Sequence, residues 1–356
     1  MSREQRKSDH IEYALKLGDG PLKNGLENVR FVHNCLPELN AVSVDTTFLL
    51  RGISLSSPIL INAVTGGTQH VTEINRSLAM TAKMAGVALA VGSQYGAVKT
   101  GKHYQSFEVV REIYPEGVIF ANISALATPQ EAAEAVKMVA AQALQIHLNS
   151  TQEIVMAEGD RNFAGYLHNI EKMLNAIDVP VIVKETGCGI SQAQIQALRQ
   201  IGISYFDVGG AGGTNFQLIE GARVGNDDLL LKDWGLTTAE TLIEAVNTCS
   251  REEYIIATGG IRNAMEVLKC LALGADMVGM AGNVLESVMQ RGPEKTAAMI
   301  QALQKELAEL MLLLGCATTR DLRRVPLCFK RELIDYLVCR GFDVRDLAYA
   351  RRNKTV

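Results

Sequence analysis

Eight short apolar runs alternate with amphipathic stretches of helix length along most of the sequence, and this alternation restricts the fold more than any other feature. The stretches between the runs repeat apolar residues every three or four positions and end in Ser, Pro or Gly, as helices on a protein surface do. Buried strands joined by helices predict a parallel sheet, and eight such units within about 250 residues predict a closed (β/α)8 TIM barrel of the α/β class. The expected strands are residues 58–63, 87–91, 118–122, 144–148, 180–185, 204–209, 254–258 and 276–280.

An open doubly wound sheet is the alternative fold, and the position of the glycines argues against it. Such a sheet carries its phosphate-binding glycines after the first strand, whereas here GGAGG, TGGIR and GMAGN follow the sixth, seventh and eighth runs. The segment from Gly209 to Gly235 exceeds a usual βα loop and is expected to cover the barrel mouth. The sequence thus divides into an N-terminal arm and preamble (1–57), a catalytic barrel (58–292) and C-terminal helices (293–356) that pack on the barrel or a neighbouring subunit.

Composition excludes several classes of function. A net charge of −4 in 356 residues, of which 47% are hydrophobic, offers no basic field for nucleic acid. Seven cysteines without a CxxC pair favour a reducing, cytoplasmic location over a disulfide framework. The N-terminus lacks the apolar core of a secretion signal, and no run approaches the roughly 18 apolar residues that a membrane span needs.

The late glycines predict a phosphate site. Gly259, Gly260 and Arg262 follow the seventh strand, and Ala281 and Gly282 follow the eighth. Backbone N–H groups at a helix start bind anions, and these two loops form the usual phosphate site of this barrel. Each motif alone also has a purely steric explanation, because strand-glycine-helix turns are common; their pairing at these two strands favours phosphate.

Other strand ends predict that the phosphate belongs to a planar heterocycle. Thr65, Ser93 and Asn122 end the first three strands, and dispersed donors and acceptors of this kind suit a ring with several carbonyl edges. Lys184 shares the parity of Ile182 in the fifth strand, so it is expected to point inward, where an ammonium would stabilise the negative charge of a reduced flavin. The alternative is a lysine that reaches solvent at a strand end.

These segments resemble those of one family, the FMN-dependent type 2 isopentenyl-diphosphate delta-isomerases. The likeness runs from RKSDH (6–10) through NAVTGGT, GSQ, IHLNSTQE, VIVKETG, DVGGAGGTNF and ATGGIR to AGN, nearly the whole chain. It implies an isomerase of isoprenoid biosynthesis that interconverts isopentenyl and dimethylallyl diphosphate, binds FMN and Mg2+, needs its flavin reduced, commonly by NADPH, and forms homo-oligomers of four subunits or more.

The resemblance also implies residue roles at the matching positions. FMN would contact Thr65, Gly66, Ser93, Asn122, Lys184, Thr214, Gly259, Gly260, Arg262, Ala281 and Gly282. The substrate diphosphate would be bound by Arg6, Lys7, His10, Ser93, Gln94, His147, Asn149 and Gln152, with Mg2+ bridged by Glu153. After GSQ some family members carry a basic residue, whereas this chain has Tyr95, so a further diphosphate contact there is not expected.

The HLNSTQE stretch fits those roles. A diphosphate brings its own Mg2+, which prefers one or two protein carboxylates beside phosphate oxygens and water, so the lone Glu153 suffices. His147 and Asn149 can donate to phosphate oxygens, and Gln152 can do so or lie near the alkene. The alternative is a polar plug of the barrel that is satisfied internally. Arg6, Lys7 and His10 share one helical face that is either a solvated arm or a cover for this or a neighbouring subunit's barrel mouth.

The expected mechanism is proton transfer to and from the alkene by the reduced flavin. No pair of carboxylates is evident at the mouth for this task, so Lys184 is assigned an electrostatic role and Gln152 an assisting one. One rival is an FMN-dependent oxidoreductase of a 2-hydroxy acid, which needs a histidine base and an arginine pair near the late loops; no histidine follows His168. Another is a barrel that binds flavin or phosphate without catalysis.

Overall fold

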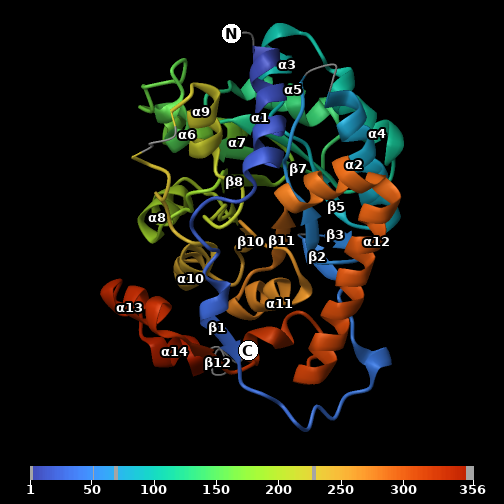
Figure 1. Cartoon of the computed structure of the whole chain (residues 1–356), viewed down its shortest axis with the longest axis vertical. Helices are drawn as coiled ribbons and strands as arrows, with labels where there is room; N and C mark the ends of the chain where they lie inside the picture. Colours follow the sequence, from blue (N-terminus) through green and yellow to red (C-terminus); the bar gives the residue numbers. More distant parts are fainter. Residues whose placement is uncertain (1–2, 51, 68–70, 227–229, 350–356) are drawn as a thin grey trace.

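The computed structural model describes residues 3–50, 52–67, 71–226 and 230–349, with the side chains of 3–6, 8 and 349 outside the description. Eight parallel strands close into one barrel in sequence order, and the last of them pairs with the first (Figure 1). This confirms the barrel and excludes the open sheet. The strands are β4 (Ile59–Ile61), β5 (Ala88–Ala90), β6 (Ile119–Ser124), β7 (Ala143–Leu148), β8 (Val181–Glu185), β9 (Tyr205–Asp207), β10 (Tyr254–Thr258) and β11 (Met277–Met280).

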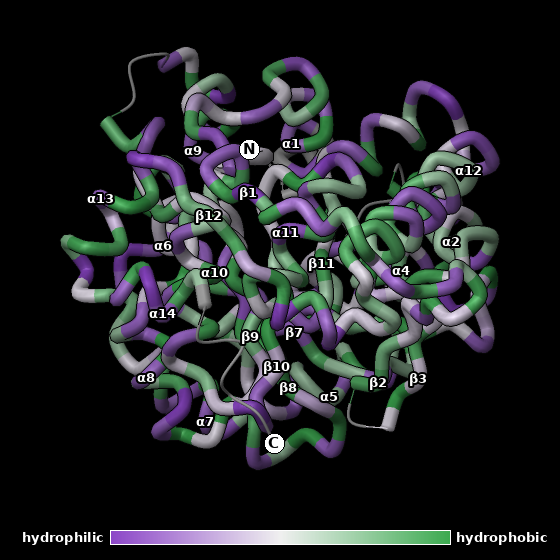
Figure 2. The backbone as a smooth tube through the Cα atoms, turned by 90° about the horizontal axis from the view of Figure 1, so that it is seen from below, coloured by the Kyte–Doolittle hydropathy of each residue, from purple (hydrophilic) through white to green (hydrophobic). Residues whose placement is uncertain are grey.

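Helices surround the barrel, and their hydrophilic and hydrophobic residues alternate along the chain, as in α2 and α4 (Figure 2). Two of them begin with a capping box, Thr128 with Glu131 and Thr237 with Glu240, which satisfies the first N–H groups and fixes where the helix starts. The helices that follow the strands are α2 (Thr72–Ala85), α3 (Tyr95–Thr100), α4 (Gln105–Ile113), α5 (Pro129–Met138), α6 (Ser150–Val155), α7 (Tyr166–Ala176), α8 (Gln192–Gln200), α9 (Phe216–Arg223), α10 (Thr238–Thr248), α11 (Ala264–Leu273) and α12 (Gly282–Leu314).

The alternation of side chains along each strand separates two hydrophobic cores. Leu60, Phe120 and Ile182 point into the barrel interior. Residues at the alternate strand positions, such as Ile146 and Val183, point outward and pack under the helices. A hairpin of β2 (Phe48–Leu50) and β3 (Ile53–Leu55) adds apolar side chains to the interior core. Because one end of the interior is filled in this way, only the carboxyl ends of the strands are left for polar residues.

A strand from the N-terminal segment pairs with one from the C-terminal segment outside the barrel. The N-terminal segment forms α1 (Arg3–Leu17) and β1 (Val29–Phe31), and β1 pairs antiparallel with β12 (Leu327–Phe329), beside α13 (Arg331–Cys339) and α14 (Val344–Tyr349) (Figure 1). Short 3-10 turns lie at Leu26–Asn28, Ala41–Ser43 and Asp321–Arg324. Helix α12 is interrupted at Gly292 and Pro293, which coincides with the expected end of the barrel region. Among the described residues, no helix combines the length and apolar character needed to cross a bilayer.

Candidate active site

A cavity of about 660 Å³ opens where the carboxyl ends of the barrel strands meet α1. Its lining residues come from five of the eight barrel strands and from the loops that follow all eight, as TIM-barrel sites do. The structure brings together nearly all of the predicted site residues. Those that line the cavity are Lys7, His10, Thr65, Gly66, Ser93, Asn122, His147, Asn149, Gln152, Glu153, Lys184, Thr214, Gly259, Gly260, Arg262, Ala281 and Gly282.

One side of the cavity, here called the glycine wall, is made of backbone. It comprises Gly209, Gly210, Gly213, Gly259, Gly260, Gly279 and Gly282. Gly260 has φ +63°, and a Cβ there would collide with the carbonyl oxygen of Gly212. Only glycine permits this contact, which packs the loop after β10 against the loop after β9. A flat ring or a phosphate can therefore lie directly against main chain on this side.

The two helix starts on the glycine wall differ, although their sequence motifs are alike. Helix α11 is capped by Asn263, whose side chain accepts a hydrogen bond from the N–H of Glu266 at 2.9 Å. Helix α12 follows Ala281, which makes no side-chain cap, and Gly282 and Asn283 line the cavity. Because the first N–H groups of α12 lack such a cap, the eighth strand's loop is the better anion site.

Arg262 serves as a brace between the glycine wall and the N-terminal segment. Its guanidinium pairs with Asp19, with Nε 3.0 Å from Oδ2, and donates to the carbonyl oxygen of Gly212 at 2.7 Å. A further bond goes to the carbonyl of Gly260. Since the guanidinium already has these partners, the contribution of Arg262 here is to hold the loops after β9 and β10 together beneath residue 19.

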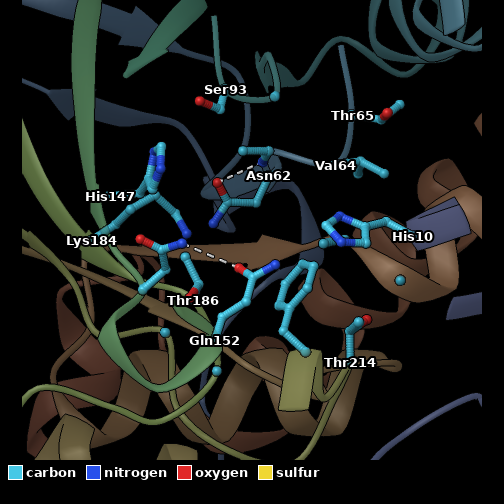
Figure 3. A pocket seen from close by; sticks show the side chains of 18 of the residues that line it. His10, Asn62, Val64, Thr65, Ser93, His147, Gln152, Lys184, Thr186 and Thr214 are labelled. Atoms are coloured by element: carbon cyan, nitrogen blue, oxygen red, sulfur yellow. Dashed lines mark hydrogen bonds between the residues drawn. The ribbon is translucent and has the colours of Figure 1, made fainter. Parts of the chain in front are cut away.

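The opposite side of the cavity, here called the polar wall, is made of side chains: Asn122, His147, Asn149, Lys184 and Glu185. Lys184 points inward, as its parity predicted. Its side chain is buried, and Nζ donates to the backbone carbonyl of Glu185 at 2.9 Å. Figure 3 shows Lys184 and His147 on one side of the cavity, with Asn62 between them and His10.

Both titratable neighbours of Lys184 have strongly shifted pKa values. Burial lowers the pKa of His147 to about 3, with the positive charges of Lys184 and Lys7 acting in the same direction and a hydrogen bond to the Ile123 carbonyl opposing them. Burial raises the pKa of Glu185 to about 7, although hydrogen bonds from the N–H groups of Cys188 and Gly187 and the Lys184 charge favour its ionised form. Glu185 follows Lys184 with the opposite strand parity, and it lines the cavity as well.

Helix α1 lies over the cavity of its own chain. The ammonium of Lys7 donates to the backbone carbonyls of Gly66 and Ser93, the latter at 3.2 Å, and so spans the loops after β4 and β5. His10 lies 2.7 Å from Glu220 of α9. Arg6 belongs to the same helix, and its side chain is outside the described part of the structure.

Glu220 is a residue that sequence reasoning missed. Its side chain is fully buried and accepts hydrogen bonds from His10 and, at 2.8 Å, from Gln152, and it also pairs with Arg223. Burial alone would raise the pKa of Glu220, but these bonds and the nearby His10 outweigh it and lower the pKa below its usual value. A carboxylate on an otherwise apolar helix face, three residues before an arginine, was the available signal.

The predicted metal residue has its oxygens engaged by donors. Glu153 accepts from Asn149 Nδ2 at 2.9 Å through Oε1 and from the N–H of Asp160 at 2.9 Å through Oε2. Asn149 also donates to Gln152 at 3.3 Å. In the described part of the chain, no three His, Cys, Asp or Glu side chains form a metal cluster. A hard cation therefore fits here only if a phosphate ligand supplies most of its oxygens.

Gln94 is the one described site residue that the structure does not bring to the cavity. Its fully buried amide donates to the carbonyl of Ala135 at 2.9 Å and accepts from the N–H of Asn122 at 2.9 Å. Both ends of the side chain are thus bound to backbone beneath the site, so Gln94 supports Asn122. Tyr95, where the family pattern varies, does line the cavity, and its hydroxyl accepts from Lys99 at 2.9 Å.

Comparisons with known proteins identify the family of this chain. The model of the FMN-dependent dehydrogenase family matches residues 114–328. The isopentenyl-diphosphate delta-isomerase of Geobacillus sp. (strain WCH70) is 43% identical over 346 residues, 97% of this chain and 99% of the relative. That of Bacillus licheniformis is 44% identical over 344 residues, 96% and 98%.

A solved structure of mandelate oxidase with (S)-2-phenylpropionate has a TM-score of 0.64 at 17% sequence identity, covering 92% of this chain and 97% of the other. Identity at this level shows a shared fold alone. The identity to the curated relatives is far higher and extends over nearly the full length of both proteins. The chain therefore belongs to the isopentenyl-diphosphate delta-isomerases of the FMN-dependent type 2 class, within the wider FMN-dependent dehydrogenase family.

Proposed function

We propose that this enzyme interconverts isopentenyl and dimethylallyl diphosphate in isoprenoid biosynthesis, with FMN and Mg2+ bound and NADPH as the reductant. The observation that carries the proposal is that one cavity has two separate places for anions. The uncapped start of α12 lies on the glycine wall, and Lys7, His10 and Asn149 lie elsewhere around the cavity. A flavin mononucleotide and a diphosphate ester together need two such places.

The glycine wall fits the cofactor. Main chain without side chains accommodates a flat ring, and the start of α12 provides backbone donors for its phosphate. Lys184 supplies the positive charge that stabilises a reduced flavin. Bound reduced FMN would supply the acid and base for the alkene. The residues proposed to hold it are Thr65, Gly66, Ser93, Asn122, Lys184, Thr214, Gly259, Gly260, Ala281 and Gly282, with Arg262 as a brace of the wall.

The substrate diphosphate is proposed to lie between α1 and the polar wall. Lys7 brings an ammonium and His10 an imidazole from above, Asn149 and Gln152 offer amide donors, and Glu153 shares Mg2+ with the diphosphate. Arg6, Ser93 and His147 complete the proposed set. Gln94 takes part only through Asn122, because its own amide is fully used by backbone.

Exclusion of water is the other task of the chain. Protonation of an alkene gives a species with carbocation character, which water would trap. Ile11 and Ala14 of α1, together with Phe216 and Leu285, present apolar surface to the cavity. With Lys7 bound across the loops after β4 and β5, α1 shields the reacting carbons from solvent.

The test is an anaerobic assay of the purified, FMN-loaded protein with isopentenyl diphosphate, Mg2+ and either NADPH or dithionite. We expect a yellow protein that isomerises the substrate only when its flavin is reduced and consumes no reductant per turnover. Stoichiometric oxidation of a 2-hydroxy acid would support the rival oxidoreductase, and flavin binding without either reaction would support a non-catalytic barrel. Omission of Mg2+ should abolish turnover while the flavin spectrum stays unchanged.

Assembly and location are further parts of the proposal. We infer a homo-oligomer of four subunits or more, with no nucleic-acid or membrane partner, in the cytoplasm. Exposed apolar side chains outside the cavity, Leu36, Val42 and Leu49, support an interface between subunits. Light scattering of the eluting protein on a sizing column would measure the mass, and a monomeric mass would contradict this inference.

A further inference from the structure

Five polar side chains, four of them on β6, β7 and β9 and the fifth directly after β4, form a hydrogen-bonded row at the base of the cavity. Asp207, Asn62, Gln145 and Asn122 are buried, and His147 ends the row at the polar wall. The separations are 2.6 Å from Asn62 Nδ2 to Asp207 Oδ2, 2.9 Å from Gln145 Nε2 to Asn62 Oδ1, 3.4 Å from Asn122 Nδ2 to Gln145 Oε1 and 2.8 Å from His147 Nδ1 to Asn122 Oδ1. Two members of the row, Asn122 and His147, belong to the proposed ligand contacts, and the connection of both to Asp207 has not been used so far.

The starting end of the row has a fixed direction. The backbone N–H of Ala63 can only donate, and it lies 2.8 Å from Asn62 Oδ1. The carboxylate of Asp207 accepts, from Asn62 and from the N–H of Gly209 at 3.3 Å. These two groups on either end of one amide decide which of its atoms is oxygen and which is nitrogen. Asn62 must therefore present its NH2 to Asp207 and its oxygen to Gln145.

The orientation of the Asn62 amide determines the orientation of the next amides in the row, because each amide has one donating and one accepting end. Gln145 has to present its NH2 to the oxygen of Asn62, which leaves its own oxygen for the NH2 of Asn122. The oxygen of Asn122 then faces His147 Nδ1. A nitrogen that meets a carbonyl oxygen at 2.8 Å must carry the proton.

We propose that Asp207 and the Ala63 amide, acting through Asn62, Gln145 and Asn122, hold His147 as the Nδ1–H tautomer, so that Nε2 meets the ligand as a hydrogen-bond acceptor. Asp207 is thus a positioning residue for the reaction. The identity of the ligand rests on the proposed function; the tautomer does not. The group that meets Nε2 has to be a donor, such as a protonated phosphate oxygen or a ring N–H. The sequence had predicted that His147 donates a hydrogen bond to a phosphate oxygen, whereas here its Nε2 accepts one.

The first experiment reads the tautomer directly. Long-range proton–nitrogen correlation spectra of the FMN-loaded, 15N-labelled protein at neutral pH distinguish the two neutral tautomers and the charged ring. The chain has six histidines, and the signal lost in His147→Gln identifies the one of interest. We expect a neutral ring with the proton on Nδ1. A proton on Nε2 alone, or a charged ring, would overturn the proposal.

The second experiment interrupts the row. Gln145→Met preserves the approximate volume and removes both amide groups, so Asn122 is no longer oriented from below. A net hydrogen-bond contribution near 1.4 kcal/mol corresponds to about a tenfold bias between tautomers, so we expect the Nε2–H form of His147 to rise from roughly a tenth to about half. Thr258→Val is the matched control, because it removes another partner of Asn62, at 2.9 Å, and leaves both fixing groups in place.

An unchanged His147 signal in folded Gln145→Met protein would refute control by the row. If that variant does not fold, Asn62→Leu serves as the second interruption, and the wild-type spectrum already tests the tautomer. Isomerase assays separate this proposal from the proposed function. An inactive wild-type protein with the Nδ1–H ring would reject only the function, and an active one with the Nε2–H ring would reject only the row.

Discussion

The glycine wall and the polar wall face the same cavity and are built on different principles. On the glycine wall, conformation is decisive: Gly260 adopts a backbone geometry and a contact that no side chain permits. On the polar wall, charge is decisive: Lys184 lies between a histidine with a lowered pKa and a glutamate with a raised one. Substitutions should therefore act through shape on one side and through electrostatics on the other.

The largest loss of stability is expected from a substitution that places a side chain in the glycine wall. Gly260→Ala combines an unfavourable φ with a collision against the carbonyl of Gly212, and we expect a loss of about 4 kcal/mol in unfolding free energy together with loss of bound FMN. Denaturant unfolding and flavin absorbance measure both. Gly341→Ala is the control, since it has φ +80° and open space around it, and it should cost only about 1 kcal/mol. Equal costs would mean that the contact is unimportant.

On the polar wall, Glu185→Gln should change how stability depends on pH. The folded protein keeps a proton on Glu185 up to about pH 7, whereas the unfolded chain releases it near 4.5, so this group's stabilisation is full below pH 4.5 and is lost as the pH rises through 7. The difference corresponds to about 3 kcal/mol. We expect the variant to gain that much relative to the wild type between pH 4.5 and 8, measured by denaturant unfolding.

His147 acts in the opposite sense between pH 3 and 6.5, because its lowered pKa makes the folded state lose stability as the pH falls. That contribution is common to both proteins and cancels when the wild type and Glu185→Gln are compared. Glu112→Gln, on the exposed face of α4, should show no such pH-dependent difference. A flat difference for Glu185→Gln as well would show that this carboxyl titrates normally.

Lys184→Met tests charge at nearly constant size. We expect turnover to fall by about 100-fold, a typical effect of removing one electrostatic contact to a reacting group, while unfolding free energy changes little. Steady-state rates with saturating FMN provide the measurement, with the exposed Lys172→Met as control. Unchanged turnover and flavin content would remove Lys184 from the site.

The smallest effects separate the two helix starts within the glycine wall. Asn263→Ala removes the cap of α11 and should cost about 1 kcal/mol in stability with FMN affinity unchanged. Gly282→Ala places a Cβ 2.8 Å from the hydroxyl of Thr214 at the start of α12, and it should weaken FMN binding several-fold with little loss of stability. Flavin titration and thermal unfolding of both variants measure the contrast. The same response in both would mean that the two loops share one role.

The sequence predicted the features that depend on periodicity. It did not predict which side chains from distant segments form hydrogen bonds with one another across the barrel. All eight strands and the inward Lys184 followed from patterns along single segments of the chain. The structure, by contrast, ties Gln94 to backbone and Arg262 to Asp19, because each found partners far away in the sequence. Glu220 was missed for the same reason, since its partners come from α1 and α6.

The pairing of β1 with β12 has a consequence for the order of events during synthesis. Val29 finds its partner in Phe329, 300 positions later, so the strand beside the arm stays unpaired until almost the whole polypeptide has left the ribosome. All barrel strands have emerged by then, and contacts of such long range form late. The barrel strands are therefore available to one another before the N-terminal strand can be tied to the C-terminal segment.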